Sequence, residues 1–408
     1  MKCKMGILVV GALIAGSMAL AADWPQWRGP DRTGLSSEKG LLKEWPKAGP
    51  ALLWSFDSLG VGYSTVAVAG DTIYTTGMID TEGYIFAIAL DGKLRWKKKY
   101  GPEWEKPYPG ARSTPTVHQG AVYVMSGRGR IVCLDAKTGD EKWSVDTVAQ
   151  FGGKILKFGI AESILVDGDN AICTAGGPDA TLIALDKMTG KTVWQTKGLS
   201  HESAYCSPIL IKRGDTRLIV TMTKEAVVAV NAETGLVLWR HPYTTQYGVH
   251  SLTPAYREDK GYLYFGSSSG GGGGMLKLAE DGKTMSVGWF EKAVNCHHGG
   301  AVLVDGYVYQ SDATKGRWSC LALADGKMMY DVPGIGKGAI TYADGMLYCY
   351  GMDASVCLVK ADPKGYEIVS SFKISSGTDE HWAHPVIANG RLYIRHGTSL
   401  MVFDVKNK

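Results

Sequence analysis

The 408-residue sequence is poor in the signals that usually assign a chain to a familiar class. Helical periodicity is not convincing anywhere along it, so no helical domain is expected. The formal net charge is only +4 and no stretch concentrates basic residues, so no nucleic-acid partner is expected. The sequence has no Cys-x-x-Cys-His haem-attachment motif and no His-Glu-x-x-His metal motif.

Cysteine is too sparse and too irregular for a disulfide framework. Of eight cysteines, Cys3 lies near the N-terminus, which leaves an odd number for the rest of the chain. Cys133, Cys320 and Cys357 occupy a repeat position that holds alanine in other repeats, namely Ala87, Ala184 and Ala229. They are therefore expected to be small, buried apolar side chains. A cross-strand disulfide between Cys349 and Cys357 is the alternative that the sequence leaves open.

Long hydrophobic runs are also missing, apart from one at the N-terminus. Residues 6–20 form an uncharged, mostly apolar run behind a short basic lead, and a small-x-small cleavage site ends at Ala21. The run is too short to span a membrane comfortably. Residues 1–21 are thus predicted to be a signal peptide, and the mature protein to be periplasmic or secreted, without a membrane anchor. Residues 22–50, which include Trp24 and Trp27, are predicted to form an arm packed on the body of the fold.

What the chain has in abundance is a repeated turn followed by an aromatic residue. The clearest copy runs from Leu134 through Asp135 and Gly139 to Trp143. Counting weaker copies, the aromatics recur every 41 to 51 residues, at Trp54, Trp96, Trp143, Trp194, Trp239, Trp289, Tyr330 and Phe372. Several short strands within a period of this length are typical of a β-propeller. Residues 51–408 are therefore predicted to be an all-β, eight-bladed propeller of four-stranded antiparallel blades.

The two ends of the repeat region predict how the ring closes. The chain ends near Val405, one strand short of a complete repeat, whereas the strand around Trp54 has no blade of its own. We expect this N-terminal strand to complete the last blade, which leaves no open gap in the circle.

Loop lengths and polar residues predict a site at one mouth of the central channel. The long connections, which share one face of a propeller, are 100–110, 148–158, 267–274 and 311–317. Six of the nine histidines lie in or just before the segments that lead into the channel-lining first strands. The candidate ligand-binding residues are Tyr63, Arg112, Glu162, His201, Glu202, Tyr205, His250, His297, His298, Lys337, His381, Trp382 and His384. If these histidines converge, protonation below about pH 6 should make the mouth positive. A metal site is an alternative use of imidazoles and carboxylates.

The repeat resembles the pyrroloquinoline-quinone-type propeller repeat across nearly the whole mature chain. Segments 23–30, 112–115, 297–300 and 384–390 resemble an exported bacterial subfamily often labelled quinoprotein-like or polyvinyl-alcohol-dehydrogenase-like. The resemblance implies two functions. One is a quinone-dependent alcohol dehydrogenase, in which Trp382 would stack on pyrroloquinoline quinone, and Glu162 and Asp379 would serve the Ca²⁺ ion and the base. The adjacent cysteines and haem domain of such enzymes are missing.

The other function is a non-catalytic binding or scaffold propeller with a histidine-rich ligand funnel, which the missing cofactor signatures favour. Its partner would be a small-molecule, glycan or polymer ligand, or a protein. No catalytic residue is assigned, and the protein is expected to be a monomer.

Overall fold

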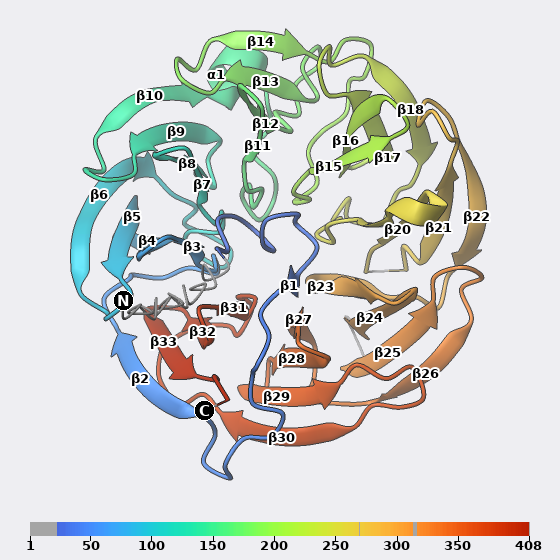
Figure 1. Cartoon of the computed structure of the whole chain (residues 1–408). Coiled ribbons are helices and arrows are strands. Elements are labelled where there is room, and N and C mark those ends of the chain that lie inside the picture. The colour runs from blue at the N-terminus through green and yellow to red at the C-terminus, as the bar shows by residue number, and fades with distance from the viewer. Residues whose placement is uncertain (1–22, 269, 313–315, 408) are drawn as a thin grey trace, which may run out of the picture.

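Eight β-sheets are arranged around a central axis in the computed structural model, which describes residues 23–268, 270–312 and 316–407 (Figure 1). Each sheet contains one four-stranded antiparallel blade, as the sequence predicts. The predicted signal peptide lies outside the described residues. No helix of the described part of the chain is long and apolar enough to cross a membrane.

The strands of each blade run outward from the channel in chain order, except in the last blade. The first four blades comprise β3 (Ala67–Ala69), β4 (Thr72–Ile79), β5 (Glu82–Ala89) and β6 (Leu94–Pro102); β7 (Thr116–His118), β8 (Ala121–Met125), β9 (Arg130–Asp135) and β10 (Glu141–Asp146); β11 (Leu165–Asp167), β12 (Asn170–Cys173), β13 (Ile183–Asp186) and β14 (Thr192–Gln195); β15 (Ile209–Arg213), β16 (Thr216–Met222), β17 (Ala226–Asn231) and β18 (Val237–Pro242).

The second half of the ring has the same plan. Its blades comprise β19 (Ala255–Arg257), β20 (Tyr262–Gly266), β21 (Gly273–Leu278) and β22 (Met285–Glu291); β23 (Cys296–Val304), β24 (Tyr307–Asp312), β25 (Arg317–Ala322) and β26 (Met328–Pro333); β27 (Gly338–Ala343), β28 (Met346–Gly351), β29 (Ser355–Lys360) and β30 (Ile368–Lys373); and β31 (Val386–Ala388), β32 (Arg391–His396) and β33 (Ser399–Asp404) with β2 (Ala51–Phe56). The described residues also contain one short helix, α1 (Thr147–Phe151), and one 3₁₀ turn, η1 (Glu258–Lys260), neither of which is predicted from the sequence.

The repeated turn owes its shape to one side chain. In the clearest copy, Asp135 accepts hydrogen bonds from the backbone N–H groups of Lys137 (2.9 Å) and Thr138 (3.1 Å). Gly139 then takes a positive φ of 74°, which glycine adopts without strain. A bulge follows between Glu141 and Trp143, as in the outermost strand pair of every blade. The aromatic side chain therefore recurs at one position in each blade.

The recurring tryptophans join each blade to the next. Each indole N–H donates a hydrogen bond to a backbone carbonyl of the following blade's turn: Trp54 to Leu90 (2.9 Å), Trp96 to Ala136 (3.2 Å), Trp143 to Lys187 (3.0 Å), Trp194 to Ala232 (3.2 Å), Trp239 to Gly282 (3.1 Å) and Trp289 to Leu323 (2.7 Å). The indoles of Trp54, Trp96 and Trp143 also lie against the turn glycines of the next blade. The aromatic ladder thus marks the contacts between blades.

The ring closes as the sequence predicts. β2, from the N-terminal part of the chain, is the outermost strand of the last blade, where it pairs antiparallel with β33 from the C-terminus. Because Trp54 lies on β2, its bond to Leu90 connects the last blade with the first. The closing strand and the closing tryptophan are therefore the same segment.

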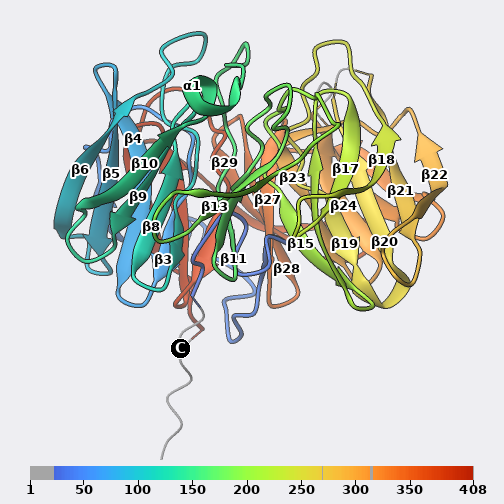
Figure 2. The same ribbon diagram turned by 90° about the horizontal axis from the view of Figure 1, so that it is seen from above.

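The arm that precedes β2 contacts the propeller from within the channel, a location that the sequence alone does not specify (Figures 1 and 2). It contacts the innermost strand, or the segment leading into that strand, in all eight blades. β1 (Leu35–Ser36) pairs in parallel with β27, which gives that sheet a fifth strand. Arg28 and Arg32 are buried and donate hydrogen bonds to carbonyl groups of the channel wall, including Ala301, Ser163 and Pro208. The arm therefore plugs the channel from one face.

Candidate functional site

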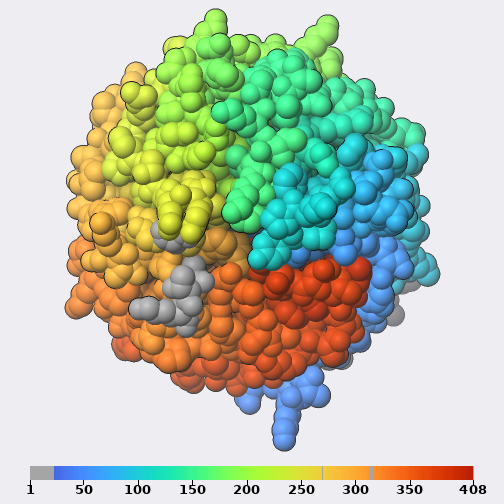
Figure 3. Space-filling view, turned by 180° about the vertical axis from the view of Figure 1, so that it is seen from behind, coloured from blue at the N-terminus to red at the C-terminus, as the bar shows by residue number. Residues whose placement is uncertain are grey.

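A cavity of about 460 Å³ lies at the mouth of the channel, bounded below by the arm. Its volume is within the range of small-ligand sites. The segments that lead into the first strands form its wall, and the loops 104–110 and 154–158 contribute to its rim. This is the face that the long connections predict, and it is opposite the side from which the arm enters (Figure 3).

Short hydroxyl side chains hold the wall segments in register. The backbone N–H of Thr65 donates to Thr114 Oγ1 (3.1 Å), that of Thr114 to Ser163 Oγ (3.0 Å), and that of Ser163 to Ser207 Oγ (3.0 Å). Each of these residues ends the segment leading into a first strand. Corresponding positions of neighbouring blades therefore meet around the channel, which brings the residues just before them to one mouth.

The floor of the cavity is Trp27, from the arm. Its indole N–H donates a hydrogen bond to Thr253 Oγ1 (3.0 Å), and its ring lies edge-on to the His384 ring, with 4.5 Å between centroids. Both partners line the cavity. The arm is therefore a component of the site.

Aromatic rings form one corner of the cavity around Trp382. The Trp382 ring lies 4.8 Å from the ring of Tyr63, 5.0 Å from that of Tyr108 and 5.3 Å from that of His298, all tilted. Phe158 faces Tyr205 across 6.1 Å, and its backbone N–H donates to the Tyr205 hydroxyl (3.2 Å). Such surfaces accept the flat or apolar face of a ring.

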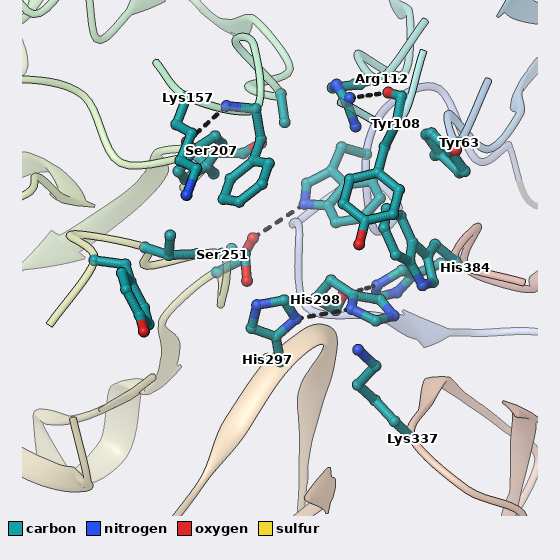
Figure 4. Close-up of a pocket in the computed structure, with 18 residues that line it drawn as sticks. Tyr63, Tyr108, Arg112, Lys157, Ser207, Ser251, His297, His298, Lys337 and His384 are labelled. Atoms are coloured by element: carbon teal, nitrogen blue, oxygen red, sulfur yellow. Dashed lines mark hydrogen bonds between the residues drawn. The ribbon is translucent and has the colours of Figure 1, made fainter. Parts of the chain in front are cut away.

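Three cations lie among these aromatic rings and line the same cavity (Figure 4). Arg112 lies over Tyr63 at 5.4 Å, Lys157 over Phe158 at 5.4 Å and Lys337 over Trp382 at 5.9 Å. Burial lowers the pKa values of Arg112 and Lys337. No aspartate or glutamate lines the cavity within the described residues.

The histidines of the cavity form a hydrogen-bonded chain whose protons can be assigned. A guanidinium only donates, so the contact between Arg28 Nη1 and His384 Nδ1 (3.4 Å) makes Nδ1 the acceptor. His384 Nε2 then carries the proton and donates to the backbone carbonyl of His298 (2.7 Å). His297 and His298 face each other through their Nδ1 atoms at 2.9 Å, so these two atoms share one proton.

These imidazoles are neutral over the physiological range. Burial lowers the pKa of His297 to about 4 and that of His384 to about 3, and it lowers the pKa of His298 well below its ordinary value. The expectation that the mouth becomes positive below about pH 6 is therefore wrong, since it assumed solvent-exposed imidazoles. The positive charge of the site comes from lysine and arginine.

Several buried polar atoms at the cavity have no hydrogen-bond partner among the described residues: Arg112 Nε, Ser251 Oγ, His298 Nε2 and Trp382 Nε1. A buried polar group without a partner costs stability. Their gathering around one cavity fits a polar ligand that supplies the missing partners.

Eight of the thirteen predicted residues line this cavity: Tyr63, Arg112, Tyr205, His297, His298, Lys337, Trp382 and His384. The other five do not. His201 contacts Thr223 Oγ1 at 2.9 Å, and Glu202 forms ion pairs with Lys154 (2.6 Å) and Lys224 (3.0 Å). These two side chains are engaged outside the cavity.

The remaining three predicted residues are held within the protein. Glu162 is buried, accepts the backbone N–H of Thr174 (2.9 Å), and has its pKa raised by burial to about 8. His250 is fully buried against Tyr243, with 4.9 Å between ring centroids. His381 stacks on His396 at 3.7 Å. Their sequence positions are correct for the mouth, but their side chains turn away from it.

Sequence reasoning missed several lining residues, of which Trp27, Tyr108, Lys157 and Phe158 are the most prominent. The last three belong to long connections that the sequence assigns to this face, but nothing in a single sequence shows which side chain of a loop turns inward. Two tryptophans outside any blade were the available signal for Trp27.

The arrangement does not fit the calcium-bound quinone of the dehydrogenases. Ca²⁺ takes six to eight oxygen ligands, largely carboxylate and carbonyl oxygens. The cavity presents ammonium, guanidinium and imidazole groups instead, and no group of three His, Cys, Asp or Glu side chains in the described residues could hold a metal ion. Glu162, which the resemblance would assign to such a role, points elsewhere.

Comparisons with known proteins agree on the repeat. The family model described as "Outer membrane protein assembly factor BamB" matches residues 81–332, more than half of the chain. A protein of that name from Burkholderia pseudomallei is 27% identical over 198 residues, covering 46% of this chain and 48% of its own length. The quinohemoprotein alcohol dehydrogenase ADH-IIG of Pseudomonas putida is 30% identical over 214 residues, covering 45% of this chain and 29% of the relative.

Solved structures show the same fold at low identity. The quinohemoprotein alcohol dehydrogenase of Comamonas testosteroni is 14% identical and superposes with a TM-score of 0.72, covering 96% of this chain and 82% of that one. The matched stretches span only a quarter to about half of the curated relatives' lengths. The similarity to these relatives therefore lies in the propeller repeat and not along their whole length.

Proposed function

The chain belongs to the family described as outer membrane protein assembly factor BamB, and from this premise we propose that it is an exported, non-catalytic binding propeller whose ligand occupies the cavity at the channel mouth. One observation carries the proposal. Aromatic, cationic and unpartnered polar groups from separate blades converge on one cavity whose floor the arm supplies.

A binding role accounts for these groups better than alcohol oxidation does. Abstraction of an alcohol proton needs a base within hydrogen-bond reach of the substrate. No carboxylate lines the cavity in the described residues, both ring nitrogens of His384 are engaged, and His297 and His298 hold a proton between their Nδ1 atoms, so the unpartnered His298 Nε2 is assigned here to ligand binding. The quinone-dependent dehydrogenase remains the second candidate because relatives such as ADH-IIG carry that name.

The proposed setting follows from the N-terminal sequence and the relatives. A cleaved signal peptide over residues 1–21 would deliver a monomeric protein to the periplasm or the medium. A small-molecule, glycan or polymer ligand fits a cavity of this size. Binding of a protein partner, as in an assembly scaffold, would instead leave the cavity without a role.

Ligand screening of the mature protein tests this function. Thermal shift and tryptophan fluorescence should reveal binding of ring compounds, and Trp382→Ala should abolish it. His201→Gln is the matched control, because this predicted ligand residue lies outside the cavity. Dye-linked alcohol oxidation with pyrroloquinoline quinone and Ca²⁺ should show no activity. Turnover under these conditions that Trp382→Ala removes would establish the dehydrogenase instead.

A further inference from the structure

The charges around the cavity narrow the ligand class, and this step rests on the proposed binding function. We propose that the ligand is a ring compound carrying a carboxylate or sulfate group, bound without a metal ion, with its ring against Trp382 and its anionic group at Lys337. Acidic sugars and aromatic acids share this chemistry.

In the part of the chain that the structure describes, the two lysines of the cavity have no counter-charge, and Arg112 donates only to the backbone carbonyls of Pro107 and Tyr108. Lys337 Nζ and Lys157 Nζ have no hydrogen-bond or ion-pair partner among the described residues. Lys154 and Lys224, by contrast, both pair with Glu202 just outside the cavity. Because Lys337 is half-buried and its ammonium has no partner within the described chain, it can accept an anion supplied from outside.

The surroundings of Lys337 make an anion more favourable there than at an exposed lysine. Lys337 is half-buried, and its ammonium lies over the Trp382 ring. A partly desolvated charge without a partner is costly, and a bound anion would offset that cost. Glu380 acts on Lys337 electrostatically but does not line the cavity.

The floor adds positive charge below the ligand. Arg28 and Arg32 are buried in the plugged channel, where their hydrogen-bond acceptors are carbonyl oxygens, Gln26 and His384. Burial lowers their pKa values to about 10 and about 9, so both are charged at neutral pH. A concave site above such charges concentrates anions.

The aromatic corner and the unpartnered polar atoms of the wall favour a ring with polar substituents. Tyr63 and Tyr108 flank Trp382 and form a corner that a flat face can enter. His298 Nε2 and Ser251 Oγ are unpartnered on the wall and can bond hydroxyl or carbonyl groups of the ligand. In Figure 4, Arg112 and Lys337 lie on opposite sides of the cluster, so a second anionic group could reach Arg112.

Isothermal titration calorimetry with a matched panel tests the ligand class. The panel pairs trigalacturonic acid with a neutral trisaccharide, and naphthalene-2,6-dicarboxylate with the corresponding diamide, in EDTA and again in Ca²⁺. We expect at least one acid to bind in EDTA and its neutral match to bind at least about tenfold more weakly. Binding of trigalacturonic acid would indicate that the ligand is an acidic sugar, and binding of naphthalene-2,6-dicarboxylate that it is an aromatic acid.

Two lysine variants locate the anion. Lys337→Gln should weaken binding of the acid by about tenfold, whereas Lys224→Gln, which removes a paired lysine outside the cavity, should change the affinity less than about twofold. Unchanged affinity in Lys337→Gln, an absolute need for Ca²⁺, or equal binding of the neutral compounds would overturn the proposal. Equal binding that Trp382→Ala abolishes would still support the binding function, whereas no binding by any member would overturn both.

Discussion

Replacing Trp54 by alanine should destabilise the whole ring, because this residue lies at the seam between the last blade and the first. The change removes the indole bond to Leu90, worth about 1 kcal/mol. It also exposes the half-buried ring face against Gly92, worth about 1–2 kcal/mol. We therefore expect a loss of about 2–3 kcal/mol in the free energy of unfolding, which for a chain of 408 residues lowers Tm by roughly 2–4 °C.

Trp143→Ala is the matched comparison, since Trp143 makes the same contact inside the ring but is only 8% exposed. It should cost about 3–5 kcal/mol. The neighbouring Leu53 is exposed, and Leu53→Ala should change stability by less than about 0.5 kcal/mol. Urea unfolding followed by circular dichroism and by fluorescence measures all three. A Trp54→Ala protein that matches Leu53→Ala, or that loses β2 in a separate early transition, would refute closure as a cooperative contact.

Three further predictions concern titratable groups. Burial raises the pKa of Glu162 to about 8, so the folded state holds a proton that the unfolded state releases above about pH 4, and the free energy of unfolding should fall between about pH 4 and pH 8. Urea titrations at several pH values measure this slope, which Glu162→Gln should remove. Cys349 and Cys357 are direct cross-strand neighbours and both are free thiols, whose pKa values are raised by burial. Iodoacetamide should therefore label them only after unfolding, and a protein mass corresponding to a disulfide would contradict the free-thiol state. Because the pKa values of His297 and His384 are about 4 and about 3, both stay neutral between about pH 5 and pH 7, and the affinity for an acidic ligand should not change over that range. Several-fold tighter binding at pH 5 would show instead that a histidine titrates there.

The fold was predictable because its signal is local and repeated. The side chain of Asp135 and the positive φ of Gly139 define a turn within a few residues, and the period of that turn gives the number of blades. Ring closure followed from counting strands at the two ends of the chain. Neither inference required knowledge of how distant side chains pack.

The site was predictable only as far as the repeat extends. Register places Tyr63, Arg112 and Lys337 at corresponding positions of different blades, so their convergence follows from the symmetry of the fold. The direction of a side chain depends instead on its own surroundings, which is why Glu162 turns toward Thr174 rather than into the cavity. Trp27 lies in an arm with no repeat to set its position.

Besides side-chain direction, the burial of the histidines could not be predicted from the sequence. A histidine near a channel mouth is expected to titrate near its ordinary pKa, but His298 and His384 are enclosed by the arm and the aromatic corner. Desolvation then decides their charge. The location of the histidines could be predicted, but their protonation could not.

The plugged channel also has a consequence for the order in which this protein assembles. The arm precedes every blade in the chain, but the hydrogen-bond acceptors of Arg28 and Arg32 include Pro208, Ala301 and His384, which belong to much later blades. The arm cannot reach its final position until those blades exist, and Trp27 cannot form the floor before then. Completion of the cavity is therefore a late event that requires the whole circle, and a truncated chain would lack the cavity even if its early blades had folded.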